Sequence, residues 1–235
     1  MQIEQSCREL GIDLSHALRV PDGRTSTYVF VGDSDGDMAI AVSDMEICEK
    51  LTPDYFASQL DLLNGAAAVV IDANLPRGSI AYLTEHCTAP IFIDPVSTVK
   101  AEKLRGLLAR VHTLKPNRIE AELLSGVKIT DEVSAEKAAQ VIMEMGVQNV
   151  IITLGSKGAL IYCDSMVDMV PAIKVEAVDT TAAGDIFNGA LTVALAEGRD
   201  LREAVRFACK ASAISVTRVG AQSSVPYRNE VDIFD

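Results

Sequence analysis

Short apolar runs rich in β-branched residues alternate with helix-spaced patterns along most of the chain. The apolar runs lie at 68–71, 91–93, 111–114 and 150–152. The patterns between and after them predict helices near 54–64, 78–86, 99–109, 118–125, 134–146, 185–197 and 201–217. This alternation is typical of a parallel sheet that helices cover on both faces. The sequence therefore predicts an α/β fold with three layers, α/β/α, around a mostly parallel sheet.

The first part of the chain has a different pattern. Two strand-like runs, 25–31 and 38–42, flank an Asp-Gly turn within 33–37 and predict a β-hairpin. No internal repeat or long linker is visible, and 235 residues suit one large domain. We therefore expect a single domain over residues 1–235, with the hairpin at about 25–43.

Composition narrows the class of protein. A hydrophobic share of 49% is sufficient for a substantial core, and a net charge of -12 argues against a nucleic-acid-binding surface. No apolar run reaches bilayer length, and the N-terminus does not resemble a signal peptide. The five cysteines are scattered and odd in number, which favours reduced thiols. We expect a cytoplasmic protein without a nucleic-acid or membrane partner.

The segment Asp179–Asp185 is the strongest candidate for chemistry. Its small residues Ala182, Ala183 and Gly184 lead directly into a predicted helix whose first turn carries Asp185. Free N–H groups at a helix start bind anions, and small residues let a ligand approach the backbone. A carboxylate beside such a site has a role if it accepts a proton from a hydroxyl that attacks a bound phosphate. Helix capping by Asp185 explains the segment equally well.

Polar or turn-forming residues follow each predicted strand. In parallel α/β folds these positions meet at the carboxyl edge of the sheet, where ligands bind. Asn74, Asp94, Asn117, Glu120, Thr153, Gly155 and Asp185 are therefore expected to converge. Ordinary turn chemistry is the alternative for each one alone, and it is strongest for Asp94.

Two further segments carry candidate binding residues. In Lys115–Gly126, Asn117 and Glu120 have the spacing of a capping box, whereas a Glu here is also suited to hold the waters of Mg²⁺. In Ile152–Ala159, the glycines permit either a turn that supports a nucleotide or a simple hairpin turn. The chain contains no P-loop, no G-x-G-x-x-G after a strand and no G-x-S-x-G.

Together these motifs resemble the PfkB/ribokinase family of carbohydrate and nucleoside kinases over nearly the whole chain. Asp179–Asp185 looks like the family's second signature, Lys115–Gly126 like its N-x-x-E region, and Thr153–Gly158 like its nucleotide-binding turn. Residues 24–126 resemble pseudouridine kinases and residues 174–227 resemble ribokinases. The resemblance implies a ribokinase-like fold and an ATP-dependent kinase that uses Mg²⁺, with K⁺ as an activator.

The resemblance also implies a role for each matching residue. Asp185 is the expected base, ionised at neutral pH because it lies at a positive helix end, and the backbone of Ala182, Ala183 and Gly184 is the expected anion hole. The residues expected to bind the nucleotide, including its magnesium, are Asn117, Glu120, Thr153, Gly155, Ser156, Gly158 and Cys209. Asn74 is expected to contact the substrate. The residues expected around K⁺ are Asp179, Thr181, Ser215, Arg218, Gly220 and Ser224.

The resemblance begins only after the family's first strand and its Gly-Gly segment with a sugar-binding Asp. We therefore expect that region to be absent before Cys7–Asp13, which would expose apolar strand edges and impair the substrate half. The hairpin resembles strands that form a lid and, in ribokinases, a homodimer interface. The leading hypothesis is a kinase of pseudouridine or ribose, and the alternative is a catalytically impaired nucleotide-binding fragment. A dehydrogenase is disfavoured without a glycine fingerprint.

Overall fold

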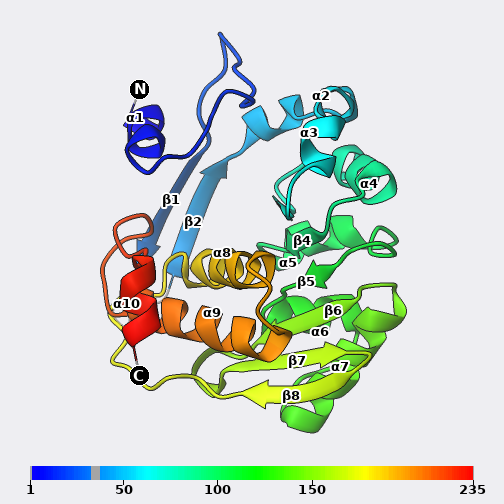
Figure 1. The fold of residues 1–235 in the computed structure, drawn as a ribbon, viewed down its shortest axis with the longest axis vertical. Helices are drawn as coiled ribbons and strands as arrows, with labels where there is room; N and C mark the ends of the chain where they lie inside the picture. Colours follow the sequence, from blue (N-terminus) through cyan, green and yellow to red (C-terminus); the bar gives the residue numbers. More distant parts are fainter. Residues whose placement is uncertain (1, 33–37, 235) are drawn as a thin grey trace.

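A six-stranded sheet forms the centre of the molecule, in the strand order β3-β4-β5-β6-β7-β8 (Figure 1). The computed structural model describes residues 2–32 and 38–234. The strands are β3 (Val69–Asp72), β4 (Ile91–Asp94), β5 (Thr113–Leu114), β6 (Asn149–Thr153), β7 (Ala159–Cys163) and β8 (Met166–Val170). β3 to β6 are parallel, whereas β7 and β8 add antiparallel strands. The structure confirms the predicted mostly parallel sheet, and the four apolar runs form β3 to β6. The strands β7 and β8 lie outside these runs and extend the sheet.

Helices cover both faces of this sheet, which confirms the three-layer prediction (Figure 1). One face carries α4 (Arg77–His86), α6 (Arg118–Ser125) and α7 (Glu132–Glu144), and the other carries α8 (Ala183–Ala196) and α9 (Leu201–Val216). The other helical segments are α1 (Gln2–Glu9), η1 (Glu46–Lys50), α2 (Pro53–Ser58), α3 (Leu60–Asn64), α5 (Thr98–Ala101), η2 (Glu102–Leu104), η3 (Gly155–Lys157) and α10 (Arg228–Ile233).

Two helix predictions differ from the structure, and two terminal helices were not predicted. The predicted helix 54–64 divides into α2 and α3 because Gln59 leaves helical geometry, with φ −107° and ψ 4°. The predicted helix 99–109 ends at Leu104, because Arg105 leaves helical geometry at ψ 124° and Gly106 turns the chain at φ +76°. The terminal helices α1 and α10 were not among the predicted helices.

The sheet separates two cores because alternate side chains of a strand point to opposite faces. In β6, Val150 and Ile152 join the cluster beneath α4, α6 and α7, whereas Ile151 joins the cluster beneath α8 and α9. All three side chains are fully buried. Burial on both faces explains why this strand is continuously apolar in sequence.

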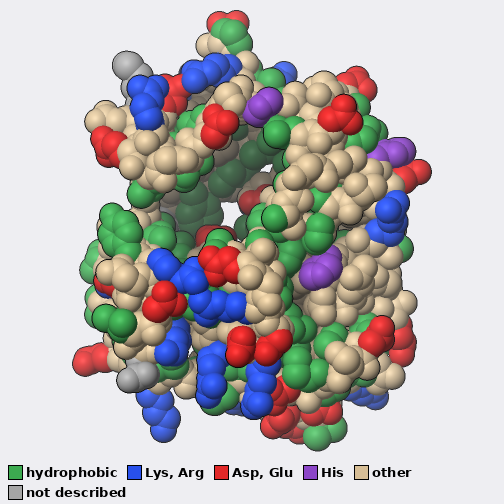
Figure 2. Space-filling view, in the orientation of Figure 1, with side chains coloured by type: hydrophobic (Ala, Val, Ile, Leu, Met, Phe, Trp, Pro, Cys, Tyr) green, Lys and Arg blue, Asp and Glu red, His purple; other side chains and the backbone are tan. Residues whose placement is uncertain are grey.

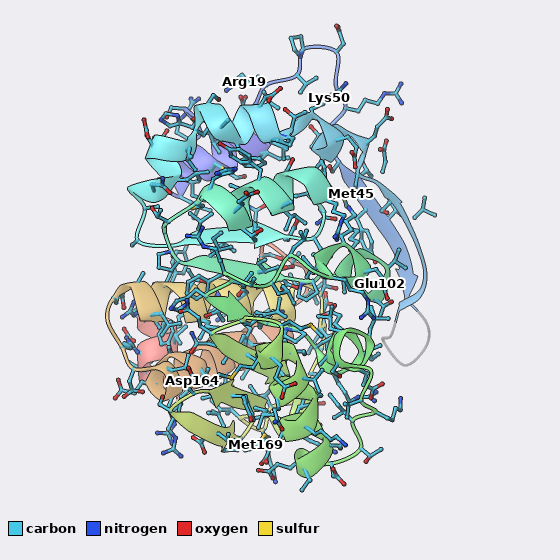
Figure 3. All side chains as sticks on the ribbon, turned by 90° about the vertical axis from the view of Figure 1, so that its right-hand side faces the viewer. Arg19, Met45, Lys50, Glu102, Asp164 and Met169 are labelled. Carbon is cyan, nitrogen blue, oxygen red and sulfur yellow. The ribbon has the colours of Figure 1, made fainter. Side chains whose placement is uncertain are left out.

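The predicted hairpin forms β1 (Thr27–Gly32) and β2 (Met38–Asp44), which pair antiparallel and extend along one side of the molecule (Figures 1 and 3). Residues 33–37 of its predicted turn lie outside the described residues. Val29 and Val42 are register partners and are both exposed, at 59% and 69%. The hairpin therefore presents apolar side chains to solvent.

β3 is an edge strand of the main sheet, as far as the described residues show. Val70 on this strand is half-exposed, and a groove of about 650 Å³ runs beside it along Leu62, Ala66 and Val69. This edge of the sheet therefore presents apolar side chains at its surface. Within the described part of the chain, no helix is both long enough and apolar enough to cross a bilayer.

Candidate active site

In the part of the chain that the structure describes, the start of α8 has backbone N–H groups for which no acceptor is recorded. Ala182 adopts the left-handed conformation at φ +59°, and Ala183 N–H bonds to Thr180 O at 3.2 Å. In the described residues, no acceptor is recorded for the N–H groups of Gly184 and Asp185. These groups therefore remain available to an anionic ligand at the positive end of α8.

Asp185 does not cap this helix with its side chain. α8 has no side-chain cap hydrogen bond, whereas Asp131 and Asp200 each accept a backbone N–H at the start of their own helices, at 2.8 and 2.9 Å. The Asp185 carboxylate thus lies in the first turn without the bond that the capping interpretation requires. This observation favours the interpretation in which the carboxylate acts on a ligand.

The surroundings of Asp185 raise its pKa. Desolvation by the adjacent protein is the main cause, although the residue keeps an exposed surface, and the nearby carboxylates of Asp94 and Asp72 add to the effect. Lys115 acts in the opposite direction. We expected the helix end to lower this pKa, and its net direction is upward because desolvation and like charges act against the helix end.

A buried ion pair lies next to the helix start. Lys115 Nζ is 2.7 Å from Asp94 Oδ2, and both side chains are more than 90% buried. A Cβ atom added at Gly184 would lie 3.1 Å from Lys115 Nζ, so the ammonium lies directly beside the Gly184 backbone. Asp94 belonged to the predicted convergent set, but Lys115 was not singled out, because only its position in the fold reveals it.

Asn117 and Glu120 form the capping box that their spacing predicted. Asn117 Oδ1 accepts the Glu120 N–H at 2.9 Å, and Glu120 Oε2 accepts the Asn117 N–H at 2.8 Å. A parallel bridge places Asn117 beside Thr153 at the end of β6. Glu120 is buried, and desolvation is the main cause of its raised pKa. The two segments therefore lie side by side at the carboxyl edge of the sheet.

The turn after β6 is a hairpin turn between antiparallel strands. Leu154 N–H bonds to Gly158 O at 2.8 Å, while Gly155 and Ser156 are exposed at the tip. The hairpin alternative is thus confirmed for the backbone, and its exposed tip remains available to a ligand. Cys209 lies on α9 in the second core, where desolvation raises its pKa to about 11, so its thiol is neutral.

Asn74 follows β3 and is held by two neighbours. Its side-chain amide donates to Asp72 Oδ2 at 2.7 Å, and its Oδ1 accepts a hydrogen bond from Lys100 Nζ. Asp72 pairs in register with Asp94, so this network adjoins the buried ion pair. Asn74 is therefore fixed at the predicted edge of the sheet.

Asp179 joins the loop before α8 to the segment after α9. Its two carboxylate oxygens accept the N–H groups of Thr181 at 2.9 Å and Gly220 at 2.8 Å. The Thr181 side chain is the main cause of its lowered pKa, and the two backbone hydrogen bonds add to the effect. Arg218 N–H bonds to Ser215 O at 3.0 Å. Ser224 is buried, and its hydroxyl donates to Ala221 O at 2.9 Å. The residues that we predicted around K⁺ thus occupy one connected region.

A carboxylate such as that of Asp179 is a ligand type that hard cations take, as are backbone carbonyls, although both Asp179 oxygens accept N–H groups here. Glu120 suits Mg²⁺ held through water, since magnesium keeps much of its hydration. Among residues 2–32 and 38–234, no three His, Cys, Asp or Glu side chains gather as a metal-binding group. Figure 2 shows the molecule hollowed between the N-terminal part with its hairpin and the segment α2–α4.

Comparisons with known proteins agree with this arrangement. The chain is 32% identical to the pseudouridine kinase of Escherichia coli over 210 residues, which are 87% of this chain and 67% of that protein. It is 48% identical to the ribokinase of Haemophilus influenzae over 124 residues, which are 53% of this chain and 40% of that protein.

Solved structures give the same result for the fold. A ribokinase from Thermotoga maritima superposes with a TM-score of 0.86 at 33% identity, covering 98% of this chain and 75% of that one. The family model described as pfkB family carbohydrate kinase matches residues 1–228. The chain therefore belongs to the pfkB family of carbohydrate kinases and has the ribokinase-like fold.

Proposed function

We propose that this protein is an ATP-dependent kinase that transfers the γ-phosphoryl group to a hydroxyl of a pentose or a nucleoside. One observation carries the proposal: Asp185, without a capping bond, lies beside backbone N–H groups that have no recorded acceptor among the described residues. A carboxylate next to an open anion site is suited to accept the proton of a hydroxyl that attacks a bound phosphoryl group.

In this proposal each group has a distinct task. Asp185 takes the hydroxyl proton. The backbone N–H groups of the Ala182–Gly184 turn bind the transferred phosphoryl oxygens, except that of Ala183, which already bonds to Thr180 O. The nucleotide lies along Thr153, Gly155, Ser156 and Gly158, with Cys209 contributing an apolar contact, while Asn117 and Glu120 orient its phosphates. Bound magnesium would neutralise charge on those phosphates. Asn74 contacts the substrate.

Pseudouridine and ribose are the proposed substrates, because proteins similar to this chain carry those names. The alternative is a nucleotide-binding protein that does not turn over a sugar. The matched regions span 67% and 40% of the lengths of the two curated relatives. ATP use and the identity of the acceptor belong to the proposal.

The test is ADP release from ATP with Mg²⁺ and K⁺, offering pseudouridine and ribose in separate reactions. We expect substrate-dependent ADP release with one of them. Folded protein that binds ATP but releases no ADP with either would contradict the kinase proposal and support the alternative. Wild-type protein without ATP or without sugar gives the background rate.

Replacing Glu120 by Gln is expected to raise the Mg²⁺ concentration needed for half-maximal turnover by about tenfold. The amide keeps an oxygen to accept the Asn117 N–H, so the capping box survives while the charge is lost. Titration of turnover with Mg²⁺ measures the effect. The control is Glu122→Gln on the same helix, which removes exposed ion pairs with Arg118 and Lys128. An unchanged Mg²⁺ requirement in E120Q would remove Glu120 from this role.

Replacing K⁺ by a large organic cation at fixed ionic strength is expected to slow turnover. The proposed reason is that an ion held near Asp179 and Gly220 stiffens the loop that forms the anion hole. The readout is the rate with potassium chloride against the rate with tetramethylammonium chloride. Equal rates in the two salts would argue against a potassium site.

We also propose that the hairpin closes over the substrate as a lid and pairs with a second copy. The exposed register partners Val29 and Val42 support an apolar contact there. The scattered cysteines support a reducing compartment, and hence the cytoplasm.

A further inference from the structure

Lys115 is a buried ammonium whose hydrogen-bonding capacity is only partly used. An ammonium has three donors, and in the part of the chain that the structure describes the one acceptor recorded for Lys115 Nζ is Asp94 Oδ2, at 2.7 Å. Its side chain is 4% exposed. A buried donor without an acceptor is costly, so the two remaining N–H bonds call for a partner.

The position of the ammonium indicates what that partner is. Nζ would lie only 3.1 Å from a Cβ added at Gly184, which places the charge beside the open N–H groups of the α8 start. Glycine at this position leaves the space next to the ammonium free of a side chain. Open backbone donors at a helix start with an ammonium beside them are suited to an oxyanion.

The surrounding structure fixes Asp94, and through it Lys115. Asp94 Oδ1 accepts the Val96 N–H at 2.9 Å, leaving Oδ2 for the ammonium. Val96 has a left-handed backbone at φ +67°, which is rare for a β-branched residue and indicates local strain. Strain of this kind persists where the neighbouring structure holds one geometry, and here it holds the carboxylate that orients Lys115.

We propose that Lys115 is a catalytic residue whose ammonium binds the transferred phosphoryl group at the start of α8, with Asp94 as its positioning residue. This inference rests on the proposed kinase function, and it adds a side-chain cation to an anion hole otherwise made of backbone. Its charge compensates the negative charge of the phosphoryl oxygens during transfer. The same ammonium opposes the rise in the pKa of Asp185.

The first test compares nucleotide affinities and needs no turnover. Titration calorimetry would measure ATP and ADP binding to the wild-type protein and to Lys115→Met. We expect the variant to weaken ATP binding clearly more than ADP binding, because only ATP carries the phosphoryl group that Lys115 contacts. An unchanged ratio of the two affinities would overturn the proposal.

The second test separates catalysis from folding. Lys115→Met alone leaves the buried Asp94 unpaired, which is destabilising, whereas the double variant D94N/K115M removes both charges. We expect the double variant to fold and to lose about a hundredfold or more in kcat. Lys115→Arg is expected to recover part of the rate, and Lys128→Met, which loses an exposed ion pair, is the control.

The outcomes distinguish this inference from the proposed function. A folded D94N/K115M variant with the wild-type kcat would overturn the proposed catalytic role of Lys115 and leave the ion pair with a structural role alone. A second outcome combines two results: the wild-type protein releases no ADP with any sugar, and Lys115→Met still has a different ratio of ATP affinity to ADP affinity. This outcome would contradict the kinase function while leaving the phosphoryl contact in place.

Discussion

Replacing Asp185 by Asn is expected to lower kcat by about a thousandfold and to leave ATP binding intact. The amide is nearly isosteric with the carboxylate but cannot accept a proton, and a positioned general base contributes about 10² to 10⁴ in rate. Because Asp185 makes no capping bond, the substitution removes no interaction that holds α8. Steady-state ADP release, together with calorimetric titration of ATP, measures both effects.

The matched control is Asp200→Asn, which makes the same chemical change at the start of α9. Asp200 Oδ1 accepts the Glu203 N–H, and Asn caps a helix as well as Asp does. We expect this control to keep both stability and turnover. A variant D185N that turns over at the wild-type rate would remove Asp185 from the mechanism.

The raised pKa of Asp185 predicts how the rate depends on pH. The base works only when it is deprotonated, so kcat/KM falls as pH falls through this pKa. Because burial and the carboxylates of Asp94 and Asp72 raise the pKa, the loss begins at a higher pH than for an ordinary aspartate. A pH-rate profile of the free enzyme tests the direction.

The location of the candidate site could be predicted from sequence because its signals are local. A small-residue turn that leads into a helix, and polar residues after apolar strands, both placed Asp185, Asn117 and Thr153 at one edge of the sheet. The structure brings Asn117 beside Thr153 through a parallel bridge, and it brings Asp94 near Asp185.

The properties that sequence did not predict depend on contacts between distant segments. Lys115 meets Gly184 only because β4, β5 and α8 pack together, and no local pattern encodes that approach. The same packing reverses the expected pKa direction of Asp185. Two predicted helix boundaries were wrong for a different reason. Single residues such as Gln59 and Arg105 leave helical geometry, although the helix-spaced apolar pattern continues past them.

Replacing Gly158 by Ala is expected to destabilise the fold severely, by at least about 4 kcal/mol in the free energy of unfolding. Gly158 has φ +107°, a conformation that residues with a side chain rarely adopt. A Cβ here would lie 2.0 Å from Val170 O and 2.7 Å from Ala172 N, which are backbone atoms that cannot rotate away. The turn would have to separate from the end of β8.

Gly155→Ala in the same turn is the matched control for this effect. Gly155 also has a positive φ, +59°, but a Cβ there would meet no atom within 4 Å. We therefore expect a cost of about 1 kcal/mol, from the backbone conformation alone. Urea unfolding of both variants measures the difference. Equal stabilities would show that the close approach of Gly158 to β8 is not what constrains this position, and the glycine would then be explained by nucleotide binding at the turn.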